Sequence, residues 1–298
     1  MAVSLSLIKR NIKLFFKDKG MFFTSLITPL ILLVLYATFL GNVYKDSFLA
    51  GIPEGVPIKE ELIDALVGGQ LISSILAVSC VTVAFCSNFL MVQDKANGTA
   101  KDLLISPVKS TVLSLAYYIS SLISTLIICF TAAGLCLVYQ AFVGWYLSFS
   151  DVVLIFLDVF ILVLFGTALS SIVNYFLSTQ GQISAVGSII SSCYGFICGA
   201  YMPISSFGSG LQKAVLFLPG TYGTSLLRNH ALGCVFEKME ADGVPSLVTE
   251  SMADVVDCNL RLGDYTFTEP AMYAILGGTT ILLITIYVFI NFFRKKAK

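Results

Sequence analysis

The sequence predicts an all-α integral membrane protein with about six transmembrane helices, and three observations support this class. Hydrophobic residues make up 57% of the 298 residues and charged residues only 12%, whereas soluble domains carry about 25% charged residues. Six apolar stretches are long enough to cross a bilayer, and the charges between them are divided unequally between the two sides. Little sequence remains for a separate soluble domain, so we treat 1–298 as one membrane domain.

The predicted spans follow from length. A helix rises ~1.5 Å per residue, so about 20 apolar residues cross the ~30 Å hydrocarbon core. The stretches that qualify are approximately 21–41, 71–92, 112–140, 152–176, 183–202 and 271–293. The fifth is the most polar, with many Ser and Gly residues. Pro29 is expected to bend the first, because proline removes one backbone hydrogen bond.

The charges between the spans predict the orientation. With the N-terminus inside, the inner segments hold 12 basic and 3 acidic residues, and the outer segments hold 6 basic and 14 acidic residues. Short cytoplasmic segments are enriched in Lys and Arg. We therefore expect both termini in the cytoplasm, and we expect a bacterial plasma membrane because no eukaryotic targeting signal is present.

An amphipathic stretch, 4–19, precedes the first span. Its apolar face holds Leu5, Ile8, Ile12, Phe15 and Phe16, and its basic face holds Lys9, Arg10, Lys13 and Lys17. This pattern is typical of a helix lying in the membrane interface. The alternative is a simple basic anchor.

Two outer loops are substantial, 42–70 and 203–270. In the second, 203–234 is too short to span the membrane and too apolar to be simply solvated, so we expect a re-entrant or surface-lying helical pair. The following segment, 236–270, is acidic and is expected to form an exposed cap. Cys234 and Cys258 are the only two of the eight cysteines in this polar region. They either form a disulfide or are two unrelated thiols.

Several kinds of chemistry are excluded by composition. The single histidine, His230, cannot build a multi-histidine metal site, so we expect no bound metal. The dipeptide Gly-Lys never occurs, which excludes a P-loop, and no GxSxG motif is present. We therefore expect neither intrinsic catalysis nor a cofactor, nor a nucleic-acid partner.

The cytoplasmic loop 94–108, between the second and third spans, is the most informative segment. Gly98 permits a turn, and Thr99 with Asp102 matches a capping box. A proline disfavours helical geometry in the residue before it, so Ser106-Pro107 ends the helix. The predicted result is a short helix presenting an apolar surface made of Leu103, Leu104 and Ile105. An ordinary capped turn is the alternative.

This loop resembles the segment E-R-x-x-G-T-x-x-x-L-L-x-[ST]-P-[VL] of ABC transporter type-2 permeases. Gly98, Thr99, Leu103, Leu104, Ser106, Pro107 and Val108 match, and Asp94-Lys95 replaces Glu-Arg with charge conserved. Further along, Gly199-Ala200-Tyr201-Met202-Pro203-Ile204-Ser205 resembles G-x-x-x-P-[IL]-S, and Leu218–Arg228 resembles P-x-x-[YH]…[LA]-R. The resemblance extends over the whole chain, and the cap 236–270 is its least transferable part.

The resemblance implies a permease subunit of an ATP-driven exporter. Two copies, or this chain and a sister permease, would pair with two separate cytoplasmic ATPase subunits, which would bind ATP and Mg. Residues 94–108 would form the coupling helix, with Asp94, Lys95, Gly98, Thr99, Leu103, Leu104, Ile105, Ser106 and Pro107 as its ATPase-coupling residues. The second and fifth spans would border the translocation path. The substrate stays open among drugs, peptides, lipids, glycans and ions.

Two features inside the spans have two interpretations each. Burying Asp158 in ionised form costs roughly 2.5–3.5 kcal/mol, so it is either a hydrogen-bonded structural acid or a transport or proton-coupling residue. Gly187, Ser191, Gly195 and Gly199 recur every four residues in the fifth span. Such a stripe lets helix backbones approach closely, either within the fold or at a subunit interface or pathway wall.

Two other functional classes remain open. A stand-alone secondary transporter or channel would need more ionisable groups in its spans, and internal repeats that the sequence lacks. A membrane-bound sensor or scaffold would not need the loop 94–108.

Overall fold

The fold confirms the all-α class. A computed structural model describes residues 2–50, 52, 58–105, 108, 110–263 and 265–293, and within these ranges a few side chains, including that of Leu104, lie outside the description. The helices are α1 (Ala2–Lys17), α2 (Lys19–Leu35), α3 (Gly41–Ala50), α4 (Glu60–Ala96), α5 (Thr99–Ile105), α6 (Ser110–Val143), α7 (Phe149–Phe176), α8 (Gln180–Ile197), α9 (Ser209–Leu216), α10 (Pro219–Ala241), α11 (Ser246–Val255) and α12 (Glu269–Phe293). A π-helical turn (Tyr36–Leu40) joins α2 to α3, and a 3-10 turn (Ile204–Ser206) precedes α9. Two short strands, β1 (Arg261–Leu262) and β2 (Tyr265–Thr266), pair antiparallel.

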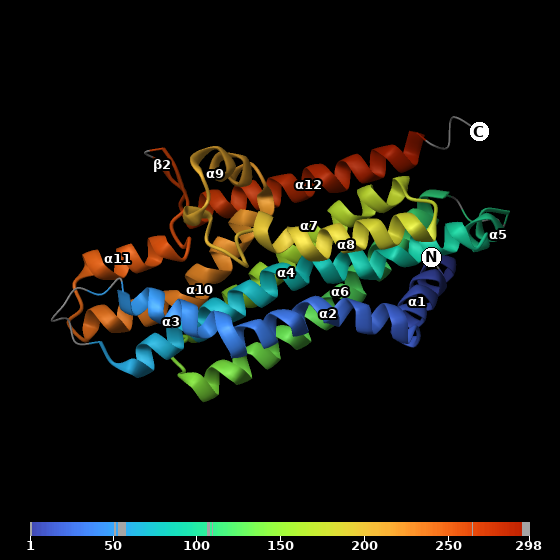
Figure 1. The fold of residues 1–298 in the computed structure, drawn as a ribbon. Coiled ribbons are helices and arrows are strands. Elements are labelled where there is room, and N and C mark those ends of the chain that lie inside the picture. The colour runs from blue at the N-terminus through green and yellow to red at the C-terminus, as the bar shows by residue number, and fades with distance from the viewer. Residues whose placement is uncertain are drawn as a thin grey trace.

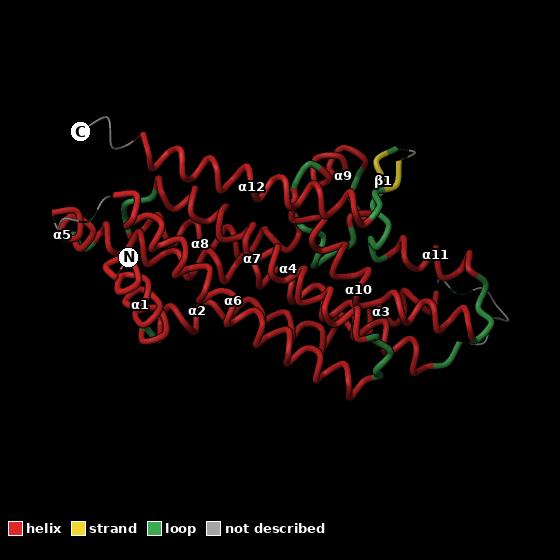
Figure 2. Tube along the Cα trace, turned by 180° about the vertical axis from the view of Figure 1, so that it is seen from behind, coloured by secondary structure: helices red, strands yellow, loops and turns green. Residues whose placement is uncertain are grey.

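The molecule is an elongated bundle with distinct ends. Figure 1 places α1, α5 and the C-terminal end of α12 at one end, and α11 with the strand hairpin toward the other. Figure 2 shows the same division from behind. We call these the α5 end and the α11 end.

Helix α4 forms the centre of the bundle. Its most apolar 18-residue stretch is entirely buried, and α2, α6, α7, α8 and α10 all pack against it. Small residues make this close packing feasible. A Cβ atom at Gly166 of α7 would lie 2.9 Å from the Cys80 carbonyl oxygen, and one at Gly69 would lie 2.9 Å from that of Ala231. Both glycines therefore allow neighbouring helices to contact α4 directly.

Five of the predicted spans correspond to helices that are long and apolar enough to cross a membrane. These helices are 19–49, α4, α6, α7 and α12, counted over the described residues. The remaining predicted span, the fifth at 183–202, is instead the shorter helix α8, which is not among them. Its chain reverses at Gly199, which has φ +75°.

The loop predicted at 42–70 is wrong over most of its length. The first span continues through the π-helical turn into α3, and α4 begins at Glu60, ten residues before the predicted end of that loop. Polar residues at the membrane surface can continue a helix that an apolar run begins. Hydropathy therefore marks the apolar part of such a helix and not its ends.

The segment 203–270 is more ordered than predicted. Its first part forms two helices, as expected, but α10 continues to Ala241 and packs against α4, α7 and α12. The expected exposed cap contains α11 and the strand hairpin, and it also contributes core residues: Val248, Met252 and Val256 are buried at a four-residue spacing. The cap is therefore packed onto the bundle on one face.

Helix α1 lies across the α5 end of the bundle (Figure 1) and packs mainly against α6. Leu7, Asn11 and Phe15 are buried, and their four-residue spacing places them on one face of the helix. Leu5 and Phe16, which belong to the predicted apolar face, are exposed. The predicted amphipathic helix is thus present. Its inner face differs by a partial turn from the one predicted, and the exposed apolar residues remain available to a membrane.

Candidate functional site

The base of the predicted coupling loop is held by Asp94. Its side chain is buried at the end of α4, and Arg10 of α1 binds both carboxylate oxygens, with Nη1 2.9 Å from Oδ2 and Nη2 3.2 Å from Oδ1. The Tyr117 hydroxyl of α6 donates to Oδ2 at 2.5 Å. The hydrogen bond to Asp94 raises the pKa of Arg10. Two-pronged Arg–carboxylate pairs fix orientation as well as distance, so α1, α4 and α6 are tied together here.

Lys95 ties the same end of α4 to α7. Its Nζ atom lies 3.0, 2.8 and 3.1 Å from the carbonyl oxygens of Asn174, Tyr175 and Leu177, which end α7. The last carbonyls of a helix lack intrahelical donors and carry partial negative charge, so a lysine stabilises them. Asp94 and Lys95, predicted as ATPase-coupling residues, therefore make intramolecular contacts that position the loop.

Helix α5 follows a turn at Gly98, whose φ of +83° favours glycine. The amides of Lys101 and Asp102 donate to the Gly98 carbonyl, so the helix begins at Thr99. Thr99 is then the first helical residue and not the cap, which corrects the predicted capping box.

The apolar residues of α5 face two directions. Leu103 packs onto a small cluster formed by Leu7, Met91, Leu113, Ala116 and Tyr117, whereas Ile105 is 85% exposed. The prediction that these residues form one outward surface is therefore wrong for Leu103, which anchors α5 to the bundle. The side chain of Leu104, and Ser106 and Pro107, lie outside the described residues.

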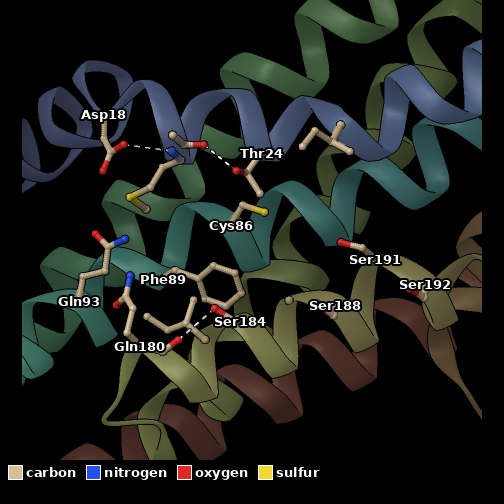
Figure 3. A pocket seen from close by; sticks show the side chains of 15 residues that line it. Asp18, Thr24, Cys86, Phe89, Gln93, Gln180, Ser184, Ser188, Ser191 and Ser192 are labelled. Atoms are coloured by element: carbon tan, nitrogen blue, oxygen red, sulfur yellow. Dashed lines mark hydrogen bonds between the residues drawn. The ribbon is translucent and has the colours of Figure 1, made fainter.

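A groove of about 700 Å³ lies between α2, α4 and α8. Figure 3 shows its labelled side chains pointing into the space between these helices. Hydroxyl groups from α2 and α8 line it: Thr24, Ser184, Ser188, Ser191 and Ser192. Its apolar wall is made of Met21, Ile27, Cys86, Phe89 and Ile183, and Asp18, Gln93 and Gln180 lie at its α5 end.

The hydroxyl groups suit a groove within a membrane, because some bond to their own helix. Thr24 donates to the Gly20 carbonyl at 2.7 Å, and Ser184 donates to that of Gln180 at 3.3 Å. Such bonds satisfy the hydrogen of each hydroxyl locally and leave oxygen lone pairs that can still accept. No basic residue is among the described residues that line the groove.

The predicted small-residue stripe serves two purposes. Gly187 and Ser191 line the groove, where Gly187 lets the Phe89 ring of α4 approach α8. Gly195 instead faces the Tyr201 ring, and Gly199 forms the turn after α8. Only half of the stripe therefore belongs to the groove.

Asp158 is not among the groove residues. Its carboxylate is fully buried between α7, α10 and α12, with Oδ2 2.6 Å from His230 Nδ1 and Oδ1 accepting from the Tyr273 hydroxyl at 2.5 Å. The expected partner of a buried acid is thus supplied by two helices.

Sequence reasoning placed Arg228 in a family-like motif but gave it no structural role. The side chain is 1% exposed, with Nη1 3.1 Å from Asp257 Oδ2 and Nη2 donating to the Gly199 carbonyl at 2.5 Å. Asp257 also accepts from the amides of Ile204 and Ser205. The family-like motif at the end of the fifth predicted span and the motif that contains Arg228 therefore contact each other directly. The sequence contained an indication of this pair, because an arginine that is buried next to Leu226-Leu227 requires a partner of opposite charge.

The Cys234–Cys258 disulfide is not formed, since both thiols are free. The Cys234 thiol donates to Asp151 of α7 at 2.7 Å. Cys258 is buried beside an earlier turn of α10, where Ser225 and Asn229 both donate to its carbonyl. Cys234 lies on a later turn of α10 than Ser225 and Asn229, which contact Cys258, so the two thiols are separated along this helix.

Comparison with known families decides the classification. A family model described as ABC-2 type transporter matches residues 4–231, well over half of the chain. The chain belongs to the ABC-2 type transporter family. No curated protein matches the sequence. The match ends within α10, so α11, the hairpin and α12 lie beyond it.

Membership has direct consequences. The ABC-2 permease is the membrane component of a transporter and is not itself catalytic, and the family implies a partnership with ABC ATPase subunits. The apolar helices and the family together place the permease in a membrane. The groove and the exposed Ile105 of α5 are two features of this permease that other molecules can reach.

Proposed function

We propose that the chain is the permease subunit of an ATP-driven exporter, and that the groove between α2, α4 and α8 forms part of the substrate's outward route. The observation that carries this proposal is the groove itself, with hydroxyl and amide groups along an otherwise apolar wall. Its Asp18, Gln93 and Gln180 lie at the α5 end, so a substrate would enter beside the coupling helix.

A second permease, either a copy or a sister chain, would close the groove. Ser184, Ser188 and Ser192 are exposed on α8, although exposed hydroxyl groups gain nothing from contact with lipid tails. In transmembrane bundles, small and polar residues favour helix–helix contacts. We place the face of α8 that carries these serines toward the partner permease and a shared path.

Helix α5 would dock on the cytoplasmic ATPase through the exposed Ile105. The contacts of Asp94 with Arg10, and of Lys95 with the end of α7, would carry a displacement of the loop into α1 and α7. ATP and Mg would be bound by the ATPase subunits. The α5 end and both termini would then face the cytoplasm of a bacterial cell, as the positive-inside charge distribution favours.

The lining favours one substrate class. Hydroxyl and amide groups can bind polar groups, the apolar wall can bind hydrocarbon, and Asp18 is the one acid among the described lining residues. A basic residue, which an anionic substrate would need, is not among them. We infer an uncharged or cationic amphipathic substrate.

The test uses the permease with the ATPase that co-purifies with it, reconstituted in nanodiscs. ATPase stimulation is measured with uncharged, cationic and anionic amphipathic compounds. Ser188→Trp should fill the groove and raise the half-stimulating concentration at least about tenfold, equal to about 1.4 kcal/mol of binding. Ile281→Trp, on an exposed face of α12, is the matched control and should behave as wild type. Unchanged stimulation of Ser188→Trp would place the substrate elsewhere.

A further inference from the structure

A cluster of ionisable side chains joins α7, α10 and α12 outside the groove. Asp158 is 0% exposed, and its two carboxylate oxygens are bound by His230 from α10 and Tyr273 from α12. These three helices also pack against one another. The carboxylate is therefore a shared contact point of all three.

The cluster has a route to the surface. His230 Nε2 is buried and has no hydrogen-bond partner, and it lies 3.8 Å from Glu269 Oε2. The Glu269 side chain is 52% exposed and lies in the first turn of α12. An exposed carboxylate, an imidazole and a buried carboxylate thus follow one another from solvent into the bundle.

The charges around His230 favour its protonated form. The groups that face it are Asp158 and Asp151 from α7, Glu269 and Tyr273 from α12, and on α10 itself Cys234, which donates to Asp151. Burial lowers the pKa of His230. The Asp158 carboxylate, with smaller contributions from Glu269 and Asp151, raises this pKa by more than burial lowers it, so the net pKa lies above 6.5. Opposite charges within a few ångströms favour the charged form.

We propose that Glu269, His230 and Asp158 form a proton-binding site that opens at the α11 end, and that proton binding fastens the start of α12 to α10. With Asp158 ionised, His230 donates from Nδ1 to it, and Nε2 carries a lone pair. A proton from solvent binds Nε2 and creates an N–H donor facing Glu269. Closing the 3.8 Å gap to hydrogen-bond distance then makes a charge-assisted bond.

The site would connect the outer pH to the packing of α12. This role rests on the orientation given in the proposed function, in which the α11 end faces outward. Proton binding itself requires only the local geometry. A test of the titration therefore stands or fails separately from the exporter proposal.

The chain contains a single histidine, which makes that test direct. Permease labelled with ¹⁵N-histidine, carrying an affinity tag without histidine, is placed in nanodiscs, and the imidazole resonances are followed against pH. We expect one titration with a midpoint above 6.5. Glu269→Gln, which removes the exposed acceptor, should lower that midpoint. Glu250→Gln, an exposed acid that pairs with Arg261 instead, should leave it unchanged. A midpoint at or below 6.5, or one that Glu269→Gln does not move, overturns the proposal.

Thermal unfolding provides a second readout. Because the folded-state pKa of His230 is raised, proton binding stabilises the fold fully below pH 6.5, and this contribution is lost as pH rises through the raised pKa. The difference in Tm between wild type and Glu269→Gln should therefore shrink as pH rises above 6.5. A difference that does not depend on pH identifies a purely structural contact and rejects the site.

Discussion

Arg228 shows how a single residue can organise the α11 end. Its guanidinium is buried and connects the turn after α8, through the Gly199 carbonyl, with Asp257 near the hairpin. Asp257 has φ +55° and binds the amides that begin the 3-10 turn. A charge in this position requires its partner, because an unpaired buried ion is costly.

We expect Arg228→Met to destabilise the permease by about 3–5 kcal/mol, since it leaves Asp257 buried without its counter-charge. Adding Asp257→Asn should recover part of this loss, because the amide is neutral and its oxygen can still accept from Ile204. Denaturant unfolding of the purified variants measures both effects. Wild-type stability of Arg228→Met alone would show that the ion pair contributes nothing.

The short helix in the loop 94–108 was predictable from the sequence, but the partners of the loop's residues were not. Asp94 and Lys95 were predicted to serve ATPase coupling directly, because they lie in the family-like segment. Their actual partners lie 84 residues away for Arg10, and 79 to 82 residues away for the end of α7. Spacing along one sequence carries no information on such contacts, and the same applies to His230 and Asp158.

Helix α5 has two sides with different roles. Leu103 faces the cluster around Leu7 and Met91, and Ile105 faces away from the bundle. Burying an isoleucine in a partner groove contributes roughly 1.5–3 kcal/mol, which is a large share of a transient interface.

We therefore expect Ile105→Asp to weaken ATPase binding at least about tenfold while the permease stays folded. Leu103→Asp should instead lower the Tm of the permease, because it places a charge in the cluster that anchors α5. The control is Leu247→Asp, the same type of change on an exposed side chain of α11. Pull-down of the ATPase at matched permease levels, together with thermal unfolding, separates the three variants. If Ile105→Asp still binds the ATPase normally, α5 is only a connecting turn.

The elements were predicted best where they contain a long apolar run. Long apolar runs located five helices, because each needs about 20 apolar residues to cross the membrane. The prediction was less accurate at helix ends, as at Glu60, since polar residues continue α4 beyond its apolar run. It was also less accurate for α10, whose mixed sequence is buried by α4, α7 and α12. Only tertiary packing explains that burial.

At the scale of the whole molecule, the ends of the bundle carry different functions. Lys59 pairs with Asp242 at 2.7 Å, which joins the start of α4 to the end of α10 at the end away from α5. Figure 1 places α1 and the C-terminal end of α12 at the α5 end. The basic residues of α1 and of the described part of the loop 94–108 therefore lie on one side, where they favour the cytoplasm.

Orientation can be tested with a membrane-impermeant thiol reagent on intact cells. The background is Cys193→Ser with Cys234→Ser, because Cys193 is exposed, Cys234 is partly exposed, and the other six cysteines are buried. We expect labelling of Glu60→Cys and Leu247→Cys, both at exposed positions. Lys101→Cys on α5, also exposed, should be labelled only after permeabilisation. The reverse pattern would place α5 outside, away from any cytoplasmic ATPase. Ile105 could then not be a docking residue, and the groove would open toward the outside at its Asp18 end, which contradicts entry from the cytoplasm.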